Sequence, residues 1–329
     1  MTIGAGDLSV GLEPVEAPPL GSAPAPRKRR RLPEPIRLLL ANPKSCFGIV
    51  LLCVIVLAAI AAPLLTSHLP AEPDALPRQA PSWEYPFGTT DQGYDIFAQV
   101  LYGARVSLGV ALVASLIAMT IAITLGLLAA YSGGWVDESI VLLTNVFLVI
   151  PILPLLIVIS SFLQGTGPTS MALIIGLTSW AIETRILRGQ ALSLRNRDFI
   201  LAAKVAGEST PRVVFGELMP NMLSRIAAGF AFIFVQAVFY EAALEFLGFG
   251  DANQVSWGTT LFWATNNSTL LTGEWWHFVF HGVAISLTIL AIVFINYGID
   301  ELSDPRLRRL ETRKRRRLLG MLWRPRAAT

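Results

Sequence analysis

The chain has 329 residues, of which 53% are hydrophobic and 15% are charged, and its mean hydropathy is +0.57. This composition lies far from the usual balance of globular domains and excludes an ordinary soluble protein. The formal net charge of +3 is small, but it conceals an uneven distribution of basic residues along the chain.

The first 40 residues differ from everything that follows. The first 35 contain seven prolines and show no apolar periodicity, and a basic run occupies Arg27–Arg31. Such a composition cannot bury enough apolar surface to fold, so residues 1–40 are predicted to be a disordered basic cytoplasmic tail. Because apolar runs follow, the basic run indicates contact with a lipid bilayer and control of topology, and no nucleic acid is expected as a partner.

Long apolar runs without charged residues dominate the chain from residue 45 onward. A hydrocarbon core about 30 Å thick requires roughly 20 helical residues, which is close to the length of most runs. One run of 44 residues is too long for a single crossing and is divided by Gln164–Pro168. The runs predict six transmembrane helices, because a lone span must satisfy its own backbone hydrogen bonds. The five runs are Ser45–Ser67, Val106–Tyr131, Ser139–Ile182, which holds two helices, Ile226–Tyr240 with an extension to Phe246, and Phe278–Ile299.

The basic residues indicate the orientation of these helices. Of the 26 lysines and arginines, 24 lie before the first run, between the fourth and fifth predicted helices, or after the last run. Loops rich in lysine and arginine stay in the cytoplasm, so both termini are predicted to be cytoplasmic. The prediction is an all-α polytopic membrane protein, with a six-helix domain at 41–300 and a basic cytoplasmic tail at 301–329. Its extracytoplasmic loops are expected at about 68–98 and 248–276.

The connection between the fourth and fifth helices, about residues 190–221, is unusually charged for its surroundings. Asp198 can cap a short helix that ends at Gly207, where glycine readily adopts the left-handed conformation of a C-cap. Pro211 fits the first turn of a second helix, and Pro220 stops or kinks the chain before the fifth span. The pattern predicts a helix–turn–helix elbow on the cytoplasmic face, suited to docking in a cleft on a soluble partner. The alternative is an ordinary solvated amphipathic loop.

The elbow contains a spaced set of small residues and a proline, namely Ala202, Ala203, Gly207 and Pro220. This spacing resembles the EAA loop of ABC importer permeases. In that family the loop binds a groove on the cytoplasmic ATPase and transmits its closure to the membrane helices. Two positions depart from the family pattern, since Leu201 stands where glutamate is common and Glu217 stands where isoleucine or histidine is usual. The resemblance implies an ATPase-coupling loop formed by Ala202, Ala203, Gly207, Glu208 and Pro220.

Four further stretches resemble C-type subunits of the dipeptide/oligopeptide/nickel permease family. Ala41–Leu52 is similar to the start of the first span, and Phe87–Leu108 is similar to the segment before the second. Glu245–Leu261 resembles the family's SFLGLG…SWG segment, and Asp300–Arg309 resembles its DxLDPRLR ending. Together with the elbow, the resemblance covers about residues 40–310. The departures from the family pattern in these stretches are Tyr94, Ala98, Gln99 and Glu245.

The resemblance implies that the chain is the permease half of an importer. It would pair with a homologous B-type permease subunit, two cytoplasmic ATPase subunits and an extracytoplasmic solute-binding protein in a bacterial or archaeal cell membrane. Closure of the ATPases would pull the elbow and rock the spans in alternating access. Di- or oligopeptides are the first expectation for the solute, and oligosaccharides or nickel are alternatives within the family.

Several chemical motifs are absent from the sequence. There is no G-x4-G-K-[ST] sequence, so ATP and magnesium are expected on partner subunits rather than on this chain. HExxH and GxSxG are absent as well, so the chain is not expected to be an enzyme or to bind a cofactor or metal. His277 and His281 are spaced for one helix face, but no third ligand is near, so they are interpreted as interfacial residues.

Glu241 and Glu245 share a helix face near the outer end of the fifth predicted span. Acidic residues at membrane depth suggest a proton or substrate site, which makes both of them candidates for the substrate path. The alternative is a position at the outer interface, where a charge costs little, and this position is expected for both.

An autonomous secondary transporter or channel is the alternative class of protein. Such proteins tend to have internal repeats and charged or broken helices near the bilayer midplane. No convincing repeat is visible, and the deep parts of the six predicted spans lack charge, which disfavours ion coupling. A membrane-embedded enzyme is disfavoured by the lack of a catalytic constellation.

Overall fold

The computed structural model describes residues 42–163 and 167–303. The predicted N-terminal tail, the centre of the predicted break at 164–166 and the predicted C-terminal tail from 304 onward lie outside the described residues. Throughout the described part the regular elements are helices, apart from a single isolated bridge between Thr89 and Asp95. The described fold is therefore all-helical, as the apolar runs predict.

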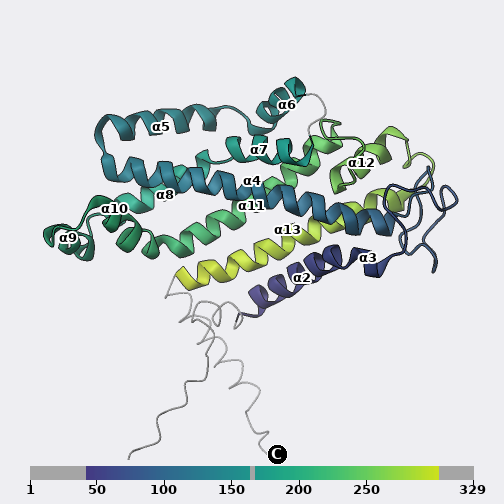
Figure 1. Cartoon of the computed structure of the whole chain (residues 1–329), viewed down its shortest axis with the longest axis horizontal. Helices are drawn as coiled ribbons and strands as arrows, with labels where there is room; N and C mark the ends of the chain where they lie inside the picture. The colour runs from purple at the N-terminus through teal and green to yellow at the C-terminus, as the bar shows by residue number, and fades with distance from the viewer. Residues whose placement is uncertain (1–41, 164–166, 304–329) are drawn as a thin grey trace, which may run out of the picture.

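Within the described residues, four helical stretches are long and apolar enough to cross a membrane. They are α2 (Pro43–Ile60), α4 (Ile96–Ser132), Thr210–Phe246, which ends in α11 (Leu223–Phe246), and the apolar part of α13 (Trp275–Ser303). Two further pairs of helices are each bent, and counting each bent pair as one span brings the total to as many as six. The chain is thus a multi-pass membrane protein (Figure 1).

The third predicted span is broken, contrary to the expectation of one crossing helix. α5 (Gly134–Val149) and α6 (Ile152–Phe162) meet at an angle of 87°. Pro151 and Pro154 at the junction carry no N–H, so two carbonyls of the preceding turn lose the donors that a continuous helix would supply. The two prolines account for the bend.

The fourth predicted span is also bent, by 43°, between α7 (Pro168–Thr178) and α8 (Ala181–Leu194). α8 continues well beyond Ile182, where the apolar run ends. The prediction that the helix stops there was wrong. The charged side chains that follow are paired with neighbouring helices instead of lying in a solvated loop.

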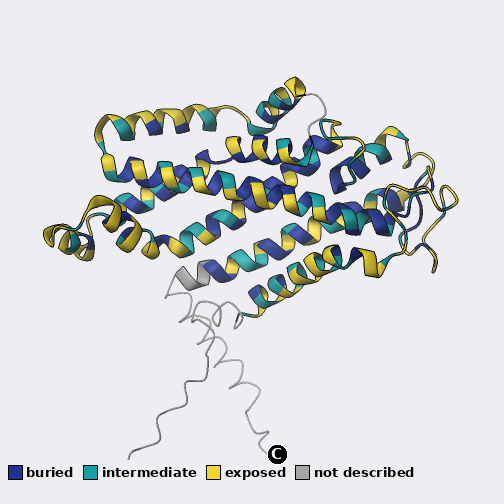
Figure 2. Ribbon diagram, in the orientation of Figure 1, coloured by how far each residue is buried: buried dark blue, intermediate teal, exposed yellow. Residues whose placement is uncertain are grey.

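α4 occupies the centre of the bundle, in contact with α8, α11, α7, α5 and α2, whereas α2 lies mainly against α13 (Figure 1). The buried faces of α4 carry alanines at helical spacing, and small side chains let membrane helices approach closely. Exposed residues cover the outward faces of α2 and α5 (Figure 2), and many of them are apolar, as expected of helices that face lipid. The buried alanines of α4 are Ala98, Ala104, Ala111, Ala114, Ala118, Ala122, Ala129 and Ala130, each at most 3% exposed.

The two ends of the bundle carry different structures. α9 (Asp198–Val205) and α10 (Thr210–Arg212) project at one end of the long axis, here named the elbow end (Figure 1). The connections at 66–95 and 247–274 gather at the opposite end, here named the loop end, together with α12 (Trp257–Asn266). The start of α2 and the end of α13 both point toward the elbow end, and the opposite ends of these helices point toward the loop end (Figure 1).

Contacts between distant segments order the loop end, which begins after the short helix α3 (Ala62–Leu65). Trp276 of α13 donates its indole N–H to the carbonyl oxygen of Thr89 at 3.1 Å. Arg78 forms an ion pair with the buried Glu274 at 3.1 Å. These contacts tie the connection before α4 to the start of α13.

His68 gives the loop end a pH-sensitive contact. Its Nδ1 lies 2.5 Å from the Asp74 carboxylate, and this hydrogen bond raises the pKa of His68 above its ordinary value of 6.5. The pKa of His68 is higher in the folded than in the unfolded chain. The contact therefore stabilises the loop fully below about pH 6.5, and this stabilisation is lost as the pH rises through the raised pKa.

We expect His68, one of three histidines, to titrate above pH 6.5 in NMR spectra of the purified chain, and Asp74→Asn to lower the midpoint of this titration. A wild-type midpoint at or below the ordinary value contradicts the contact.

Candidate functional site

The elbow connects α8 to α11 through short helical segments. After α9 the chain turns at Gly207 into α10 and continues through a π-helical and a 3-10 segment. Arg197 holds the cap position of α9 and Asp198 is its first residue, so the helix begins one residue before the predicted start. The two segments that lead into α11 are η1 (Val213–Leu218) and η2 (Pro220–Met222).

Gly207 forms the turn of the elbow, as its sequence context predicts. Its φ of +79° lies in the left-handed region, which a residue with a Cβ adopts only with strain. The N–H of Gly207 donates to the Lys204 carbonyl at 3.0 Å, and the next N–H donates to the Ala203 carbonyl at 3.1 Å. A Cβ at Gly207 would meet open space, so the backbone conformation alone favours glycine here.

The segment after the turn is wound more loosely than an α-helix. The N–H of Met219 donates to the carbonyl of Val214, five residues back, at 2.8 Å, which is the π-helical pattern. Pro220 follows and has no N–H, so the α-helical ladder cannot run through it. At Pro220, where the sequence predicts a stop or kink, the chain changes from a π-helical to a 3-10 helical segment and then continues into α11.

The inner face of the elbow is anchored to the bundle. Its buried side chains share a hydrophobic cluster with residues of α4 and α8. The Lys204 ammonium lies 5.1 Å from the centre of the Tyr131 ring, and Arg195 donates to the Ala130 carbonyl at 2.7 Å. The elbow is therefore packed against α4 and α8 and is continuous with α11. The buried elbow side chains are Ile200, Val213, Leu218 and Met222, each at most 2% exposed.

The outer face of the elbow presents apolar side chains to its surroundings. Val205 is 89% exposed and Phe215 is 64% exposed, and the exposed Arg212 and the half-buried Glu208 lie between them in the chain. Large apolar side chains exposed on a charged connection are candidates for contact with a partner. Of the predicted coupling residues, Ala202, Gly207 and Pro220 are exposed, and Ala203 and Glu208 are half-buried.

A buried ion pair joins α8 to the start of α11, directly after the elbow. Arg225 donates to both carboxylate oxygens of Glu183, at 2.8 and 3.0 Å, and Glu183 is 1% exposed. Gly229 leaves room for this carboxylate, since a Cβ there would lie 2.5 Å from Glu183 Oε2. Both residues flank the predicted spans, Glu183 directly after Ile182 and Arg225 directly before Ile226. The pair joins segments 42 residues apart, so the run pattern alone could not reveal it.

Two arginines of α8 hold α5 at the same end of the bundle. Arg188 contacts both oxygens of the Asp137 carboxylate, at 2.5 and 2.6 Å, and Arg185 donates to the Asn145 side chain at 2.5 Å. The sequence placed both arginines in a loop, whereas they lie on a helix. Polar contacts therefore tie α5, α8 and α11 together next to the elbow.

The two glutamates of α11 that are candidates for the substrate path are enclosed by protein. Glu241 is fully buried and accepts a hydrogen bond from the Ser107 hydroxyl of α4 at 2.8 Å. Glu245 is 3% exposed and accepts a hydrogen bond from the hydroxyl of Ser256, which caps α12. The two carboxylates fasten α4, α11 and α12 to one another, and their expected position at the outer interface stays a prediction.

His277 and His281 are buried, at 1% and 0% exposed. Nδ1 of His281 lies 2.9 Å from the carbonyl oxygen of His277, one helical turn back. Among the residues that the structure describes, no group of three or more His, Cys, Asp or Glu side chains could hold a metal ion. The two histidines belong to the buried part of α13, and their interpretation as interfacial residues stays a prediction.

Known proteins with similar sequences point to one family. Residues 122–309, more than half of the chain, match the family described as binding-protein-dependent transport system inner membrane component. The dipeptide transport system permease protein DppC of Alkalihalophilus pseudofirmus is 34% identical over 277 residues, which cover 84% of this chain and 90% of the relative. The protein of the same name from Bacillus subtilis is 32% identical over 280 residues, which cover 83% and 85%. A solved structure of the MetNI methionine ABC transporter covers 62% of this chain and 94% of its own, at a TM-score of 0.49 and 16% identity.

Proposed function

Because the chain belongs to the family of binding-protein-dependent transport system inner membrane components and is therefore a permease component of an ABC importer, we propose that it carries di- or oligopeptides. The names of the relatives support this solute, since both are dipeptide transport system permeases. The importer would be completed by a homologous B-type permease, two ATPase subunits and a solute-binding protein in a bacterial cell membrane. ATP and magnesium would bind to the ATPase subunits, and no cofactor to this chain.

The elbow is the proposed site of coupling to the ATPases, with the elbow end in the cytoplasm. The observation that carries this proposal is the division of the elbow into two faces. The outer face offers exposed apolar side chains to a partner, and the inner face is buried against α4 and α8. The chain also runs from the elbow into α11 without a flexible linker. Closure of a bound ATPase would therefore move three membrane helices together, which is the rocking that alternating access requires.

Substitution of the outer face tests the proposal. Val205→Ser and Phe215→Ser replace exposed apolar groups and leave the buried anchor of the elbow intact. Removal of a central apolar anchor from an interface typically costs about 2 kcal/mol or more, or about thirtyfold in affinity. We expect each variant to reach the membrane and to lose co-purification of the ATPase subunits.

Leu271→Ser is the matched control, because Leu271 is also 89% exposed but lies at the loop end. This variant should retain the ATPases. If the two elbow variants co-purify with ATPases as well as the wild type does, the outer face is not the coupling surface.

A further inference from the structure

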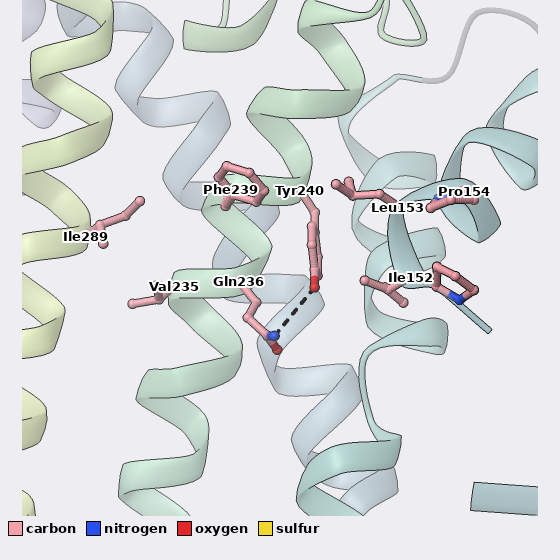
Figure 3. Close-up of a pocket in the computed structure, with 9 residues that line it drawn as sticks. Ile152, Leu153, Pro154, Val235, Gln236, Phe239, Tyr240 and Ile289 are labelled. Carbon is pink, nitrogen blue, oxygen red and sulfur yellow. Dashed lines mark hydrogen bonds between the residues drawn. The ribbon is translucent and has the colours of Figure 1, made fainter. Parts of the chain in front are cut away.

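Two adjoining cavities lie beside α11, where both bent helix pairs break. The larger, about 550 Å³, is bounded by the α5–α6 junction, by α11 and by Ile289 of α13 (Figure 3). The smaller, about 190 Å³, extends along the α7–α8 break. Both are lined by Pro151, Ile152, Gln236 and Tyr240, so they form one recess, here named the break cavity. Its larger part falls in the usual range for small-molecule sites, about 300–1,000 Å³.

The lining of the break cavity is mostly apolar and includes no charged residue. The Gln236 amide donates to the Tyr240 hydroxyl at 3.4 Å, with Ile152 and Leu153 on the neighbouring segment (Figure 3). At the other break, Ser179 is 9% exposed, and its hydroxyl has no hydrogen-bond partner within the described part of the chain. A few uncharged polar groups thus stand in apolar walls.

The backbone adds acceptors at the same place. Pro151 and Pro154 have no N–H, so the carbonyls of Phe147 and Ile150 lose the donors of a continuous helix. Irregular backbone at membrane depth is tolerated only where protein buries it or where it lines a cavity, because lipid offers no hydrogen bonds. Phe147 and Ile150 both line the smaller part of the break cavity. A lipid tail in the recess would leave these carbonyls without donors.

We propose that the solute passes this chain through the break cavity, and that Gln236, Tyr240 and Ser179 contact the backbone amides of a short peptide. A peptide brings N–H donors for the freed carbonyls and carbonyl acceptors for the two hydroxyls, and its apolar side chains fit the walls. A nickel ion would find no carboxylate, imidazole or thiol in this lining. The inference rests on the proposed peptide importer. It assigns the contact to Gln236 and Tyr240 instead of Glu241 and Glu245, whose carboxylates bond to α4 and to the cap of α12.

The test uses the whole importer in proteoliposomes, with ATP on the elbow side and radiolabelled dialanine as the probe. Gln236→Leu and Tyr240→Phe each remove polar atoms with little change in volume. At saturating binding protein, each variant is expected to slow uptake about two- to tenfold, the effect of one lost hydrogen bond. Thr124→Val is the matched control, because its hydroxyl bonds only to the Thr120 carbonyl of its own helix and lies outside the cavity. It should leave uptake unchanged.

A second measurement does not depend on the folding of the variants. A photoreactive dipeptide, irradiated during ATP-driven turnover of the wild-type importer, should label residues 147–154 or 235–240. Normal uptake by both variants, with labels confined to other segments, contradicts the inference and leaves the peptide importer intact. Absence of any peptide uptake by the wild type contradicts the proposed function itself. Labelling only of the partner permease or of lipid also overturns the inference, because the recess is then filled by that neighbour.

Discussion

Gly207→Pro is expected to abolish ATP-driven uptake while the chain still inserts into the membrane. Proline fixes φ near −65°, whereas Gly207 has a φ of +79°. Proline also removes the N–H that donates to the Lys204 carbonyl at the end of α9. A misfit of this kind costs about 3 kcal/mol or more, so α9 must leave the turn in another direction. Uptake into proteoliposomes should fall at least about tenfold, and the amount of protein in the membrane fraction should not change.

Two other substitutions separate the geometry of the elbow from a general effect of proline. Gly207→Ala keeps the N–H and should cause a smaller loss, because alanine adopts the left-handed region at a cost of about 1–2 kcal/mol. Gly273→Pro is the matched control at the loop end, where Gly273 has a φ of +86° and open space around it. This control should retain the ATPase subunits. Normal uptake by Gly207→Pro would remove the coupling role of the turn.

Arg225→Met is expected to destabilise the chain severely. It leaves the Glu183 carboxylate, which is 1% exposed, without its charged partner. Removal of one member of a buried ion pair typically costs about 3–5 kcal/mol, because the remaining charge is uncompensated. Thermal unfolding of the purified chain should shift to lower temperature, and less protein should accumulate in the membrane.

The double variant Glu183→Gln, Arg225→Met shows whether the charge is responsible. With neither charge present, most of the lost stability should return, since replacing a whole buried ion pair is often nearly neutral. A double variant as unstable as Arg225→Met would mean that the shape of the arginine, rather than its charge, supports the junction of α8 and α11. Its uptake activity then shows whether transport itself requires the pair.

The sequence predicted those features that depend on residues close together in the chain, namely the apolar helices and the turn at Gly207. Charge-free runs located the apolar helices, because a hydrocarbon core sets both their length and their composition. The left-handed turn at Gly207 followed from a glycine placed directly after a short helical pattern. The elbow as a whole was visible because its charged residues interrupt apolar surroundings.

Other features depended on contacts that only the folded chain defines. Pro151 is plain in the sequence, but a proline in an apolar run can give a slight kink or, as here, a bend of 87°. The hydrogen bond from Ser107 of α4 to the carboxylate of Glu241 joins residues 134 positions apart, so no local pattern could indicate it. Gln236 and Tyr240 carry no motif at all. Their importance comes from the two helix breaks that α11 faces.

Reconstituted transport tests the central claim most directly. The chain, its partner permease, the ATPase subunits and a loaded solute-binding protein should together accumulate dialanine in proteoliposomes only when ATP is present on the elbow side. Omission of the ATPases, or Val205→Ser in this chain, should abolish accumulation. Uptake of dialanine by this chain alone, without ATPases or ATP, would contradict the account and identify an autonomous transporter.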